Sequence, residues 1–176
     1  MDNRKNRFEA VYLQTYERIL GYATRRCDSP HDAADVVAET YAIAWRRFDS
    51  LPENGEARLW LYGVARNVLA NHRRGVARHR HRSVELDTDV ADLYARSPES
   101  SVELNAITRA LRELPEDDRE LISLVAWEGL DHGEIAKVLG CSRNAVRIRL
   151  YRARKRLSKA LAVAGVSVSH LVMESA

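Results

Sequence analysis

The residues best suited to chemistry are the arginines that crowd one stretch near the C-terminal end, RNAVRIRLYRARKRL, residues 143–157. Guanidinium groups bind phosphate and also read guanine through paired hydrogen bonds, and asparagine pairs in the same way with adenine. At 100° per residue, Val146, Leu150, Ala153 and Leu157 fall on one face of a helix. We therefore expect this helix to pack on its own domain through that face and to offer its other side to a DNA major groove.

The outward side of this predicted helix, flanked by Arg154, carries the residues that we expect to contact bases and phosphates. These residues are Arg143, Asn144, Arg147, Ile148, Tyr151, Arg152 and Lys155. Residues near the start of such a helix reach base edges, and the later arginines bind phosphates.

A short helix is predicted directly before the arginine-rich one. Asp131 followed by Glu134 forms the pattern of a capping box, in which each side chain accepts from a backbone N–H of the other residue. Gly140 suits the left-handed position that ends a helix, and Ser142 suits the N-cap of the next one. Its buried face is expected to consist of Ile135, Ala136, Val138 and Leu139. Two helices joined by a short turn are the helix-turn-helix geometry.

A basic amphipathic helix can also be a solvated cationic face, or it can lie on a membrane surface. The capped helix and the glycine turn in front of it favour DNA binding. An independent repressor or activator would use the same geometry, usually as a dimer on a palindrome. An enzyme acting on nucleic acid is disfavoured, since the sequence has no Gly-rich phosphate loop and no recognisable nucleophile–base pair. We expect no enzymatic activity and no cofactor.

The elements that position these residues are all expected to be helices. Apolar residues recur at helical spacing in four stretches, which begin at Phe8, Val37, Leu61 and Leu104 and include Trp45 and Phe48 as expected core residues. The 176 residues are 45% hydrophobic and 30% charged, which is typical of a folded soluble protein. No apolar run approaches the roughly 20 residues of a membrane span, and the first residues do not resemble a signal peptide. The two cysteines are consistent with a reducing compartment, so we expect a cytoplasmic protein.

The charge is unevenly distributed although the net charge is only +3. Basic clusters at residues 66–82 and 143–159 are separated by an acidic, Ser-containing stretch that lacks a helical stripe. We predict an all-α protein with two small helical domains, residues 5–78 and 102–163, and an acidic flexible linker, residues 79–101. Residues 164–176 form an apolar tail. Cys27 and His31 have ligand-like spacing, but no second pair accompanies them, so no metal site is expected.

Three motifs resemble those of extracytoplasmic-function (ECF) sigma factors, a group of the sigma-70 family. LPEDDRELISLVAWEGLDHGEIAKVLGCSRNAVRIRLYRARKRL is similar to region 4, which reads the promoter −35 element. SPHDAADVVAETYAIAWRRF resembles the core-binding helix of region 2, and ARLWLYGVARNVLANHRR resembles the segment that reads and opens the −10 element. The match covers about residues 8–160 in the family's order, without a region 1.1 or a region 3 domain.

The resemblance implies an alternative sigma factor that binds core RNA polymerase and directs promoter-specific initiation. Its expected polymerase contacts are the β′ clamp helices and the β flap, and the residues expected to bind are Asp32, Asp35, Glu39 and Arg46. Like charges four residues apart destabilise an isolated helix slightly, so the acidic residues gain if a basic partner docks on them. A solvated acidic face that favours the helix N-terminus is the alternative.

The −10 element is expected to meet a group of residues opposite Leu61, Val64 and Val68. This group consists of Arg66, Asn67, Asn71, Arg73 and Arg74, and His72, His79 and His81 are assigned to the same basic patch. By resemblance, a base flipped out of the non-template strand enters a pocket in the loop of residues 50–57. Trp60 and Tyr62 are candidates for stacking on unpaired bases, with a core position favoured for Trp60.

The remaining partners follow from the resemblance as well. The family implies promoter DNA and an anti-sigma factor that covers both domains, and neither a membrane nor a second copy of the chain is expected. In the family the acidic linker threads toward the active-site and RNA-exit channels of the polymerase, and a simple flexible tether is the alternative.

Overall fold

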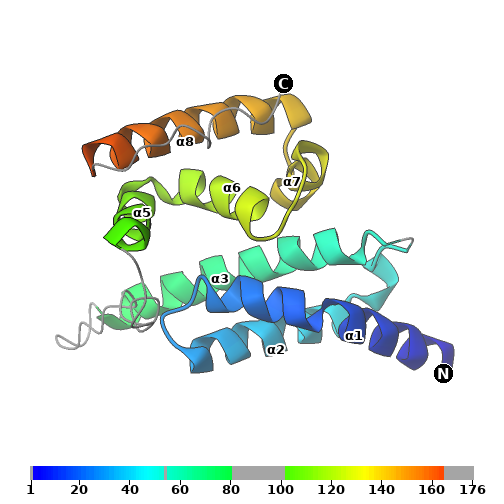
Figure 1. Ribbon diagram of the computed structural model, residues 1–176. Coiled ribbons are helices and arrows are strands. Elements are labelled where there is room, and N and C mark those ends of the chain that lie inside the picture. Colours follow the sequence, from blue (N-terminus) through cyan, green and yellow to red (C-terminus); the bar gives the residue numbers. More distant parts are fainter. Residues whose placement is uncertain (1, 54, 81–101, 165–176) are drawn as a thin grey trace. The chain divides into compact units, whose positions relative to one another are not determined.

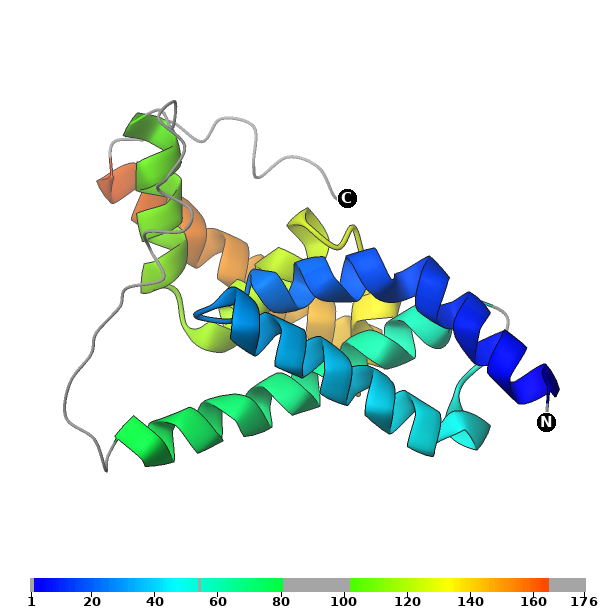
Figure 2. The same ribbon diagram turned by 90° about the horizontal axis from the view of Figure 1, so that it is seen from below.

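The computed structural model describes residues 2–53, 55–80 and 102–164. The chain divides into two compact units, Met1–Val90 and Ala91–Ala176. All regular elements in the described ranges are helical, as Figures 1 and 2 show, which confirms the predicted all-α class with two helical domains. No helix in these ranges is long and apolar enough to cross a bilayer. The acidic segment predicted as a linker and the apolar tail lie outside the described residues, apart from the end of α3 and Ala164.

The first unit consists of three long helices that lie side by side (Figure 1). They are α1 (Asp2–Thr24), α2 (Pro30–Arg46) and α3 (Ala57–Arg80), with a short 3-10 helix, η1 (Phe48–Ser50), after α2. Each long helix packs against the other two. Their shared core contains Ile19, Tyr22, Val36, Leu61 and Tyr62, all of which are almost completely buried.

The start of α2 is determined by local chemistry. Ser29 has an extended backbone, and its hydroxyl accepts a hydrogen bond from the backbone N–H of Asp32. Pro30 occupies the first turn, where a missing N–H costs nothing and the fixed φ favours the helix. Further along α2, the hydroxyl of Tyr41 lies 2.8 Å from that of Thr15 on α1. This buried pair satisfies both polar groups inside the core.

The second unit is built around its last helix. It comprises α5 (Val102–Glu113), α6 (Glu116–Ala126), α7 (His132–Leu139) and α8 (Arg143–Val163), and α8 packs against the other three. The buried face of α8 consists of Val146, Leu150, Ala153 and Leu161, while Leu157 is only half-buried. The predicted apolar stripe is therefore confirmed, with Leu161 added at its end.

Candidate nucleic-acid interface

The turn between α7 and α8 has the predicted stereochemistry. The Asp131 carboxylate accepts from the backbone N–H groups of Gly133 and Glu134, and the Glu134 carboxylate accepts from the Asp131 N–H at 3.0 Å. These hydrogen bonds hold the pKa of Asp131 below its ordinary value. Gly140 has φ +63°, a left-handed conformation that suits glycine, and Ser142 caps α8 by accepting from Ala145 N–H. The capping box, the glycine turn and the serine cap are all confirmed.

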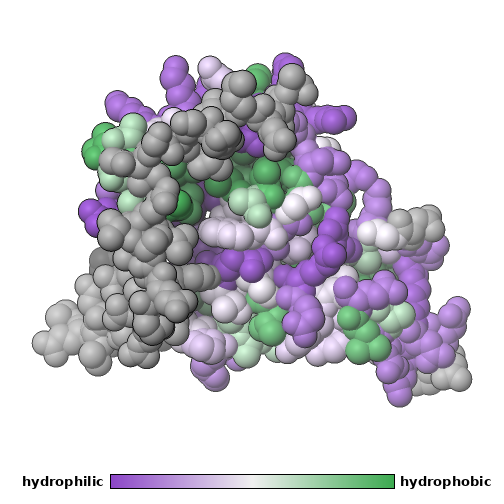
Figure 3. Space-filling view, in the orientation of Figure 1, coloured by the Kyte–Doolittle hydropathy of each residue, from purple (hydrophilic) through white to green (hydrophobic). Residues whose placement is uncertain are grey.

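The outward side of α8 is polar and cationic. Its exposed residues include seven predicted contacts, whose side chains are free of the domain core: Arg143, Asn144, Arg147, Ile148, Tyr151, Arg152 and Lys155. Arg147 Nη2 donates to Asn144 Oδ1 at 3.0 Å, so the two residues that can each read a base are ordered against each other. Tyr151 is 67% exposed, which is high for an aromatic side chain. In the space-filling view, hydrophilic side chains project along the upper edge of the molecule, where α8 lies (Figures 1 and 3).

Two other arginines of α8 have a different task. Arg156 Nη1 donates to the carboxylate of Asp118, a buried residue in the first turn of α6, and Arg149 lies 3.5 Å from Asp117. Both arginines flank the core-facing side of α8, on the border next to the outward residue Arg152. The cations of this helix therefore serve two purposes, since some face solvent and others hold α8 to α6.

The predicted −10 residues of α3 divide between two sides of the helix. Asn67, Asn71 and Arg74 lie three and four residues apart, and they share an exposed face opposite the buried one. Arg66 is half-buried on a flank, and on the same flank Arg73 Nη2 approaches the carbonyl oxygen of Arg26 at 3.5 Å. Val64, expected opposite this group, is half-buried on the other flank. The five residues thus form one outward face and one flank.

Three aromatic side chains of the first unit differ in how far they are buried. Tyr62 is completely buried, and its ring centroid lies 5.2 Å from that of Tyr22. The prediction that Tyr62 could stack on an unpaired base is therefore wrong. Trp45, predicted in the core, is 43% exposed: it lies near the end of α2, where it packs against Phe8, Phe48 and Arg4. Trp60 is half-buried and packs against the cluster of Phe48, Leu51 and Ala57, which agrees with the favoured core position.

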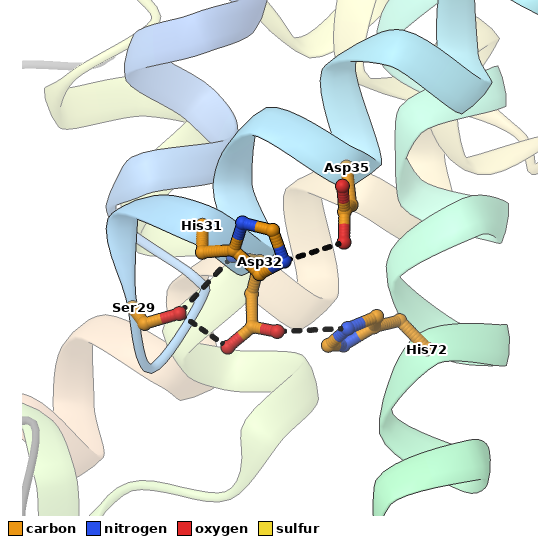
Figure 4. A network of polar contacts seen from close by, with 5 residues as sticks. All are labelled: Ser29, His31, Asp32, Asp35 and His72. Atoms are coloured by element: carbon orange, nitrogen blue, oxygen red, sulfur yellow. Dashed lines mark hydrogen bonds and ion pairs between the residues drawn. The ribbon is translucent and has the colours of Figure 1, made fainter.

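The acidic residues of α2 do not act as one group. Figure 4 shows that Asp32 points from α2 toward α3, where its Oδ1 lies 3.2 Å from His72 Nε2. Its other oxygen accepts from the Ser29 hydroxyl at 2.7 Å. His72 therefore pairs with α2, and its assignment to the basic patch is wrong. The two remaining acidic residues, Asp35 and Glu39, are exposed on the outer side of α2.

The outer acidic residues of α2 form weak ion pairs with other residues of the same helix. Glu39 Oε1 lies 2.8 Å from Arg46 Nη2, and Asp35 Oδ2 lies 3.5 Å from His31 Nε2. All four side chains are more than half exposed, and exposed ion pairs of this kind contribute at most about 1 kcal/mol. A competing cation from a docking protein can displace them at little cost.

Cys27 and His31, the pair with ligand-like spacing, do not form a shared site. His31 is exposed and turned toward Asp35, whereas Cys27 is buried. Burial raises the pKa of the Cys27 thiol to about 11, with a smaller contribution from the Asp32 carboxylate. This thiol is protonated at neutral pH, which makes it a poor nucleophile and a poor metal ligand.

Some contacts have no counterpart among the expectations from the sequence. The Asp32–His72 pair joins residues forty positions apart in the sequence, and no local sequence pattern predicts it. The ion pairs of Arg149 and Arg156 with α6 could have been predicted from the sequence. The two arginines are seven residues apart, almost two helical turns, so they lie on the same face, and an acidic run, Glu116–Asp118, precedes α8. Arg4 and Arg7 of α1, which contact the segment after α2, had no such signal.

Comparison with known proteins gives both units the same family. Residues 11–79 match the family described as Sigma-70 region 2, and residues 104–157 match Sigma-70, region 4. The chain is 32% identical over 171 residues to the RNA polymerase sigma-H factor of Pseudomonas aeruginosa, covering 89% of this chain and 87% of that protein. It is 33% identical over 160 residues to the ECF RNA polymerase sigma-E factor of Escherichia coli (strain K12), covering 84% and 83%.

Solved structures agree. The sigma factor RpoE, crystallised in complex with the anti-sigma factor NepR from Bartonella quintana, matches with a TM-score of 0.67 and 25% identity, over 89% of this chain and 97% of that one. CnrH, in complex with the cytosolic domain of CnrY, matches with a TM-score of 0.63 and 26% identity, over 90% of both chains. Both units, in their order along the chain, have the regions of these transcription initiation factors. The chain belongs to the sigma-70 family of RNA polymerase sigma factors, in its ECF group.

Proposed function

We propose that this sigma factor binds core RNA polymerase through α2, opens and reads the −10 element with α3 and the loop before it, and anchors at the −35 element with α8. The observation that carries the proposal is the outward face of α8 behind its capped helix and glycine turn. Its exposed cations and its ordered Arg147–Asn144 pair are chemically matched to phosphates and base edges. In this proposal the two functional domains are residues 5–78 and 102–163, with residues 79–101 as linker and 164–176 as tail.

Polymerase binding is assigned to the outer side of α2. Asp35, Glu39 and Arg46 are exposed there, and their present ion pairs are weak enough to be exchanged for contacts with the β′ clamp helices. Asp32 contributes indirectly in this scheme, since its pair with His72 joins α2 to α3. The β flap is the corresponding partner of the second unit.

The −10 contact is assigned to the exposed face of α3 and to its flank. Asn67, Asn71 and Arg74 face outward together, while Arg66 and Arg73 lie at the side. Asparagine and arginine suit adenine and phosphate respectively. The flipped base is assigned to the loop of residues 50–57, which leads into α3.

Regulation by an anti-sigma factor is part of the proposal. A relative of the same fold has been crystallised with the anti-sigma factor NepR, and the match covers nearly all of that chain. We assign this chain to the cytoplasm, as a monomer with no membrane contact, no cofactor and no catalytic activity of its own.

Run-off transcription tests the proposal. Purified protein is added to bacterial core RNA polymerase on a genomic promoter library, and the 5′ ends of the transcripts are mapped. Defined start sites that appear only with the added protein are expected, together with weak binding to duplex DNA by the protein alone. Absence of any defined start, or tight binding to a palindromic duplex without polymerase, would overturn the proposal in favour of an independent regulator.

A further inference from the structure

The segment between α2 and α3 is held from one side by an arginine of α1. Arg7 Nη2 donates to the carbonyl oxygen of Leu51 at 2.8 Å, and Nη1 lies 3.2 Å from the Glu53 carboxylate. The guanidinium carbon of Arg7 also lies 5.0 Å from the centroid of the Phe48 ring. One side chain from the N-terminal helix thus contacts three positions of the segment that leads into α3.

A second arginine supports the first one turn earlier. Arg4 Nη2 donates to the carbonyl oxygen of Trp45 at 2.9 Å, and its guanidinium carbon lies 5.0 Å from the ring centroids of both Trp45 and Phe48. The Phe48 ring therefore has two guanidinium groups at the same distance. Arginine suits this position because its planar group stacks on aromatic rings and donates in several directions at once.

Beneath the arginines lies a small apolar cluster that joins α1 and α3 to the segment after α2. It consists of the buried residues Phe48, Leu51 and Ala57, with Phe8, Val11 and Trp60 packed against it. Phe8 and Val11 come from α1, and Trp60 comes from α3. The segment after α2 is therefore anchored at its base by apolar packing and along its backbone by Arg7.

The contacts of Arg7 differ in strength. Glu53 is 72% exposed, so its ion pair with Arg7 contributes little. The hydrogen bond to Leu51 has a charged donor, and its acceptor belongs to a residue that is only 3% exposed, so its loss is more costly. The carbonyl of Leu51 and the ring of Phe48 are therefore the contacts that matter.

We propose that Arg7, supported by Arg4, is a positioning residue that holds residues 50–53, the first part of the loop of residues 50–57, in place to receive the flipped −10 base. This inference rests on the proposed function, in which the loop holds that base. Flipping a base costs a few kcal/mol, and residues 51–53, which Arg7 already holds in place, do not add an ordering cost of their own. Arg7 does not touch DNA in this scheme and acts through the backbone at Leu51.

The test is a comparison of base preference, with the full chain bound to core polymerase. A start site is first mapped with the wild-type protein, and the −10 element of that promoter is then randomised and transcribed in competition. We expect Arg7→Gln to reduce the ratio between preferred and disfavoured −10 bases about tenfold, because small displacements at a binding site have large effects on rate. Arg7→Lys keeps the charge but loses the planar guanidinium group that stacks on Phe48. We expect this variant to reduce the same base-preference ratio about three- to fivefold.

Two further variants separate the contacts. Glu53→Gln removes only the exposed ion pair, so its base preference should stay within about twofold of the wild type. Arg18→Gln changes an exposed arginine on the same helix, far from this loop in the sequence, and serves as the matched control. Preference at the −35 element should be unaffected in all four variants.

The outcomes distinguish this inference from the proposed function. If the wild-type protein starts transcription at no defined site, the proposed function fails. If it does, and Arg7→Gln and Arg7→Lys keep the wild-type −10 preference while only their thermal stability falls, Arg7 is merely structural and this inference is overturned. Should Arg7→Gln fail to fold, as judged by circular dichroism, the result for Arg7→Lys decides.

Discussion

Cys27 follows α1 and is buried within the first unit, where its backbone N–H donates to the carbonyl of Ala23 at 3.0 Å. Its pKa of about 11 lies well above the ordinary value of 9.0 because burial disfavours the thiolate. The folded chain therefore holds this proton to a higher pH than the unfolded chain does. Stability from this group is complete below about pH 9 and is lost as the pH rises toward 11.

This difference predicts an alkaline loss of stability in the first unit. The loss from Cys27 amounts to at most about 2–3 kcal/mol between pH 9 and 11, and Tyr41, whose pKa burial raises to about 12, adds to it at higher pH. Thermal unfolding followed by circular dichroism across this range measures it. Cys27→Ala should flatten the decline, whereas Cys141→Ala, at a half-buried cysteine of the second unit, should leave it unchanged.

A pair of arginines in α8 offers a matched test of burial. Arg156 pairs with Asp118, whose side chain is only 10% exposed, while Arg149 pairs with the largely exposed Asp117. Arg156→Gln should cost the second unit about 1–3 kcal/mol, since a buried carboxylate loses its charged partner. Arg149→Gln should cost about 0.5 kcal/mol or less.

Amide hydrogen exchange in α6 and α8 measures both changes, since a two-unit chain has no single free energy of unfolding. Equal losses of protection in the two variants would contradict the assigned role of Asp118 burial.

At the scale of the element, the start of α8 determines the positions of the residues that are proposed to contact bases. Arg143, Asn144 and Arg147 lie in the first turns, and the Ser142 hydroxyl satisfies the Ala145 N–H at 3.1 Å. Without this cap, the first turn is expected to fray, and the Arg147–Asn144 pair would lose its fixed position. The cap is therefore part of the proposed −35 interface as well as part of the fold.

Ser142→Ala should destabilise this turn by about 1 kcal/mol, and Ser142→Asn, which retains a capping oxygen, should restore it. Hydrogen exchange of residues 143–147 measures the fraying, and transcription from promoters that differ only at −35 measures the loss of base preference. Ser158→Ala, a change of the same type within α8 and away from its cap, is the control. Faster exchange with unchanged −35 preference would separate the cap from recognition.

At the scale of the whole molecule, two weakly basic surfaces on one chain can together give an affinity for DNA that neither surface has alone. The net charge is only +3, so general attraction to DNA is weak. Linking two binding units turns the second contact into an intramolecular one, which raises affinity without new contacts. In the proposed function, promoter selection then depends on polymerase holding both units to the same DNA, with α2 as the point of attachment.

Glu39→Arg tests this attachment. It should reduce co-purification with core polymerase by about tenfold or more, since it reverses a charge and places a second cation beside Arg46. The circular dichroism spectrum should not change, because Glu39 is exposed. Glu17→Arg, at an exposed position of α1, is the matched control. Unchanged binding of the Glu39 variant would remove α2 from the proposed polymerase interface.

Much of this organisation was determined by the sequence alone, because it depends on neighbours along the chain. The helical class, the capping box at Asp131, the left-handed Gly140 and the outward face of α8 all follow from spacings of two to four residues. Local rules of hydrogen bonding and helical periodicity suffice for such features. The family motifs, which are contiguous, were identifiable for the same reason.

Only the tertiary structure decided which polar side chains face solvent and which hold helices together. Asp32 and His72, Arg156 and Asp118, and Arg7 and Leu51 meet across distances in sequence of about forty residues. Identical residue types near them in the chain, such as Asp35 and Arg152, point outward. Burial and pairing depend on how the helices pack against one another, and a charged residue at the border of a helical face can turn either way until its neighbour is in place.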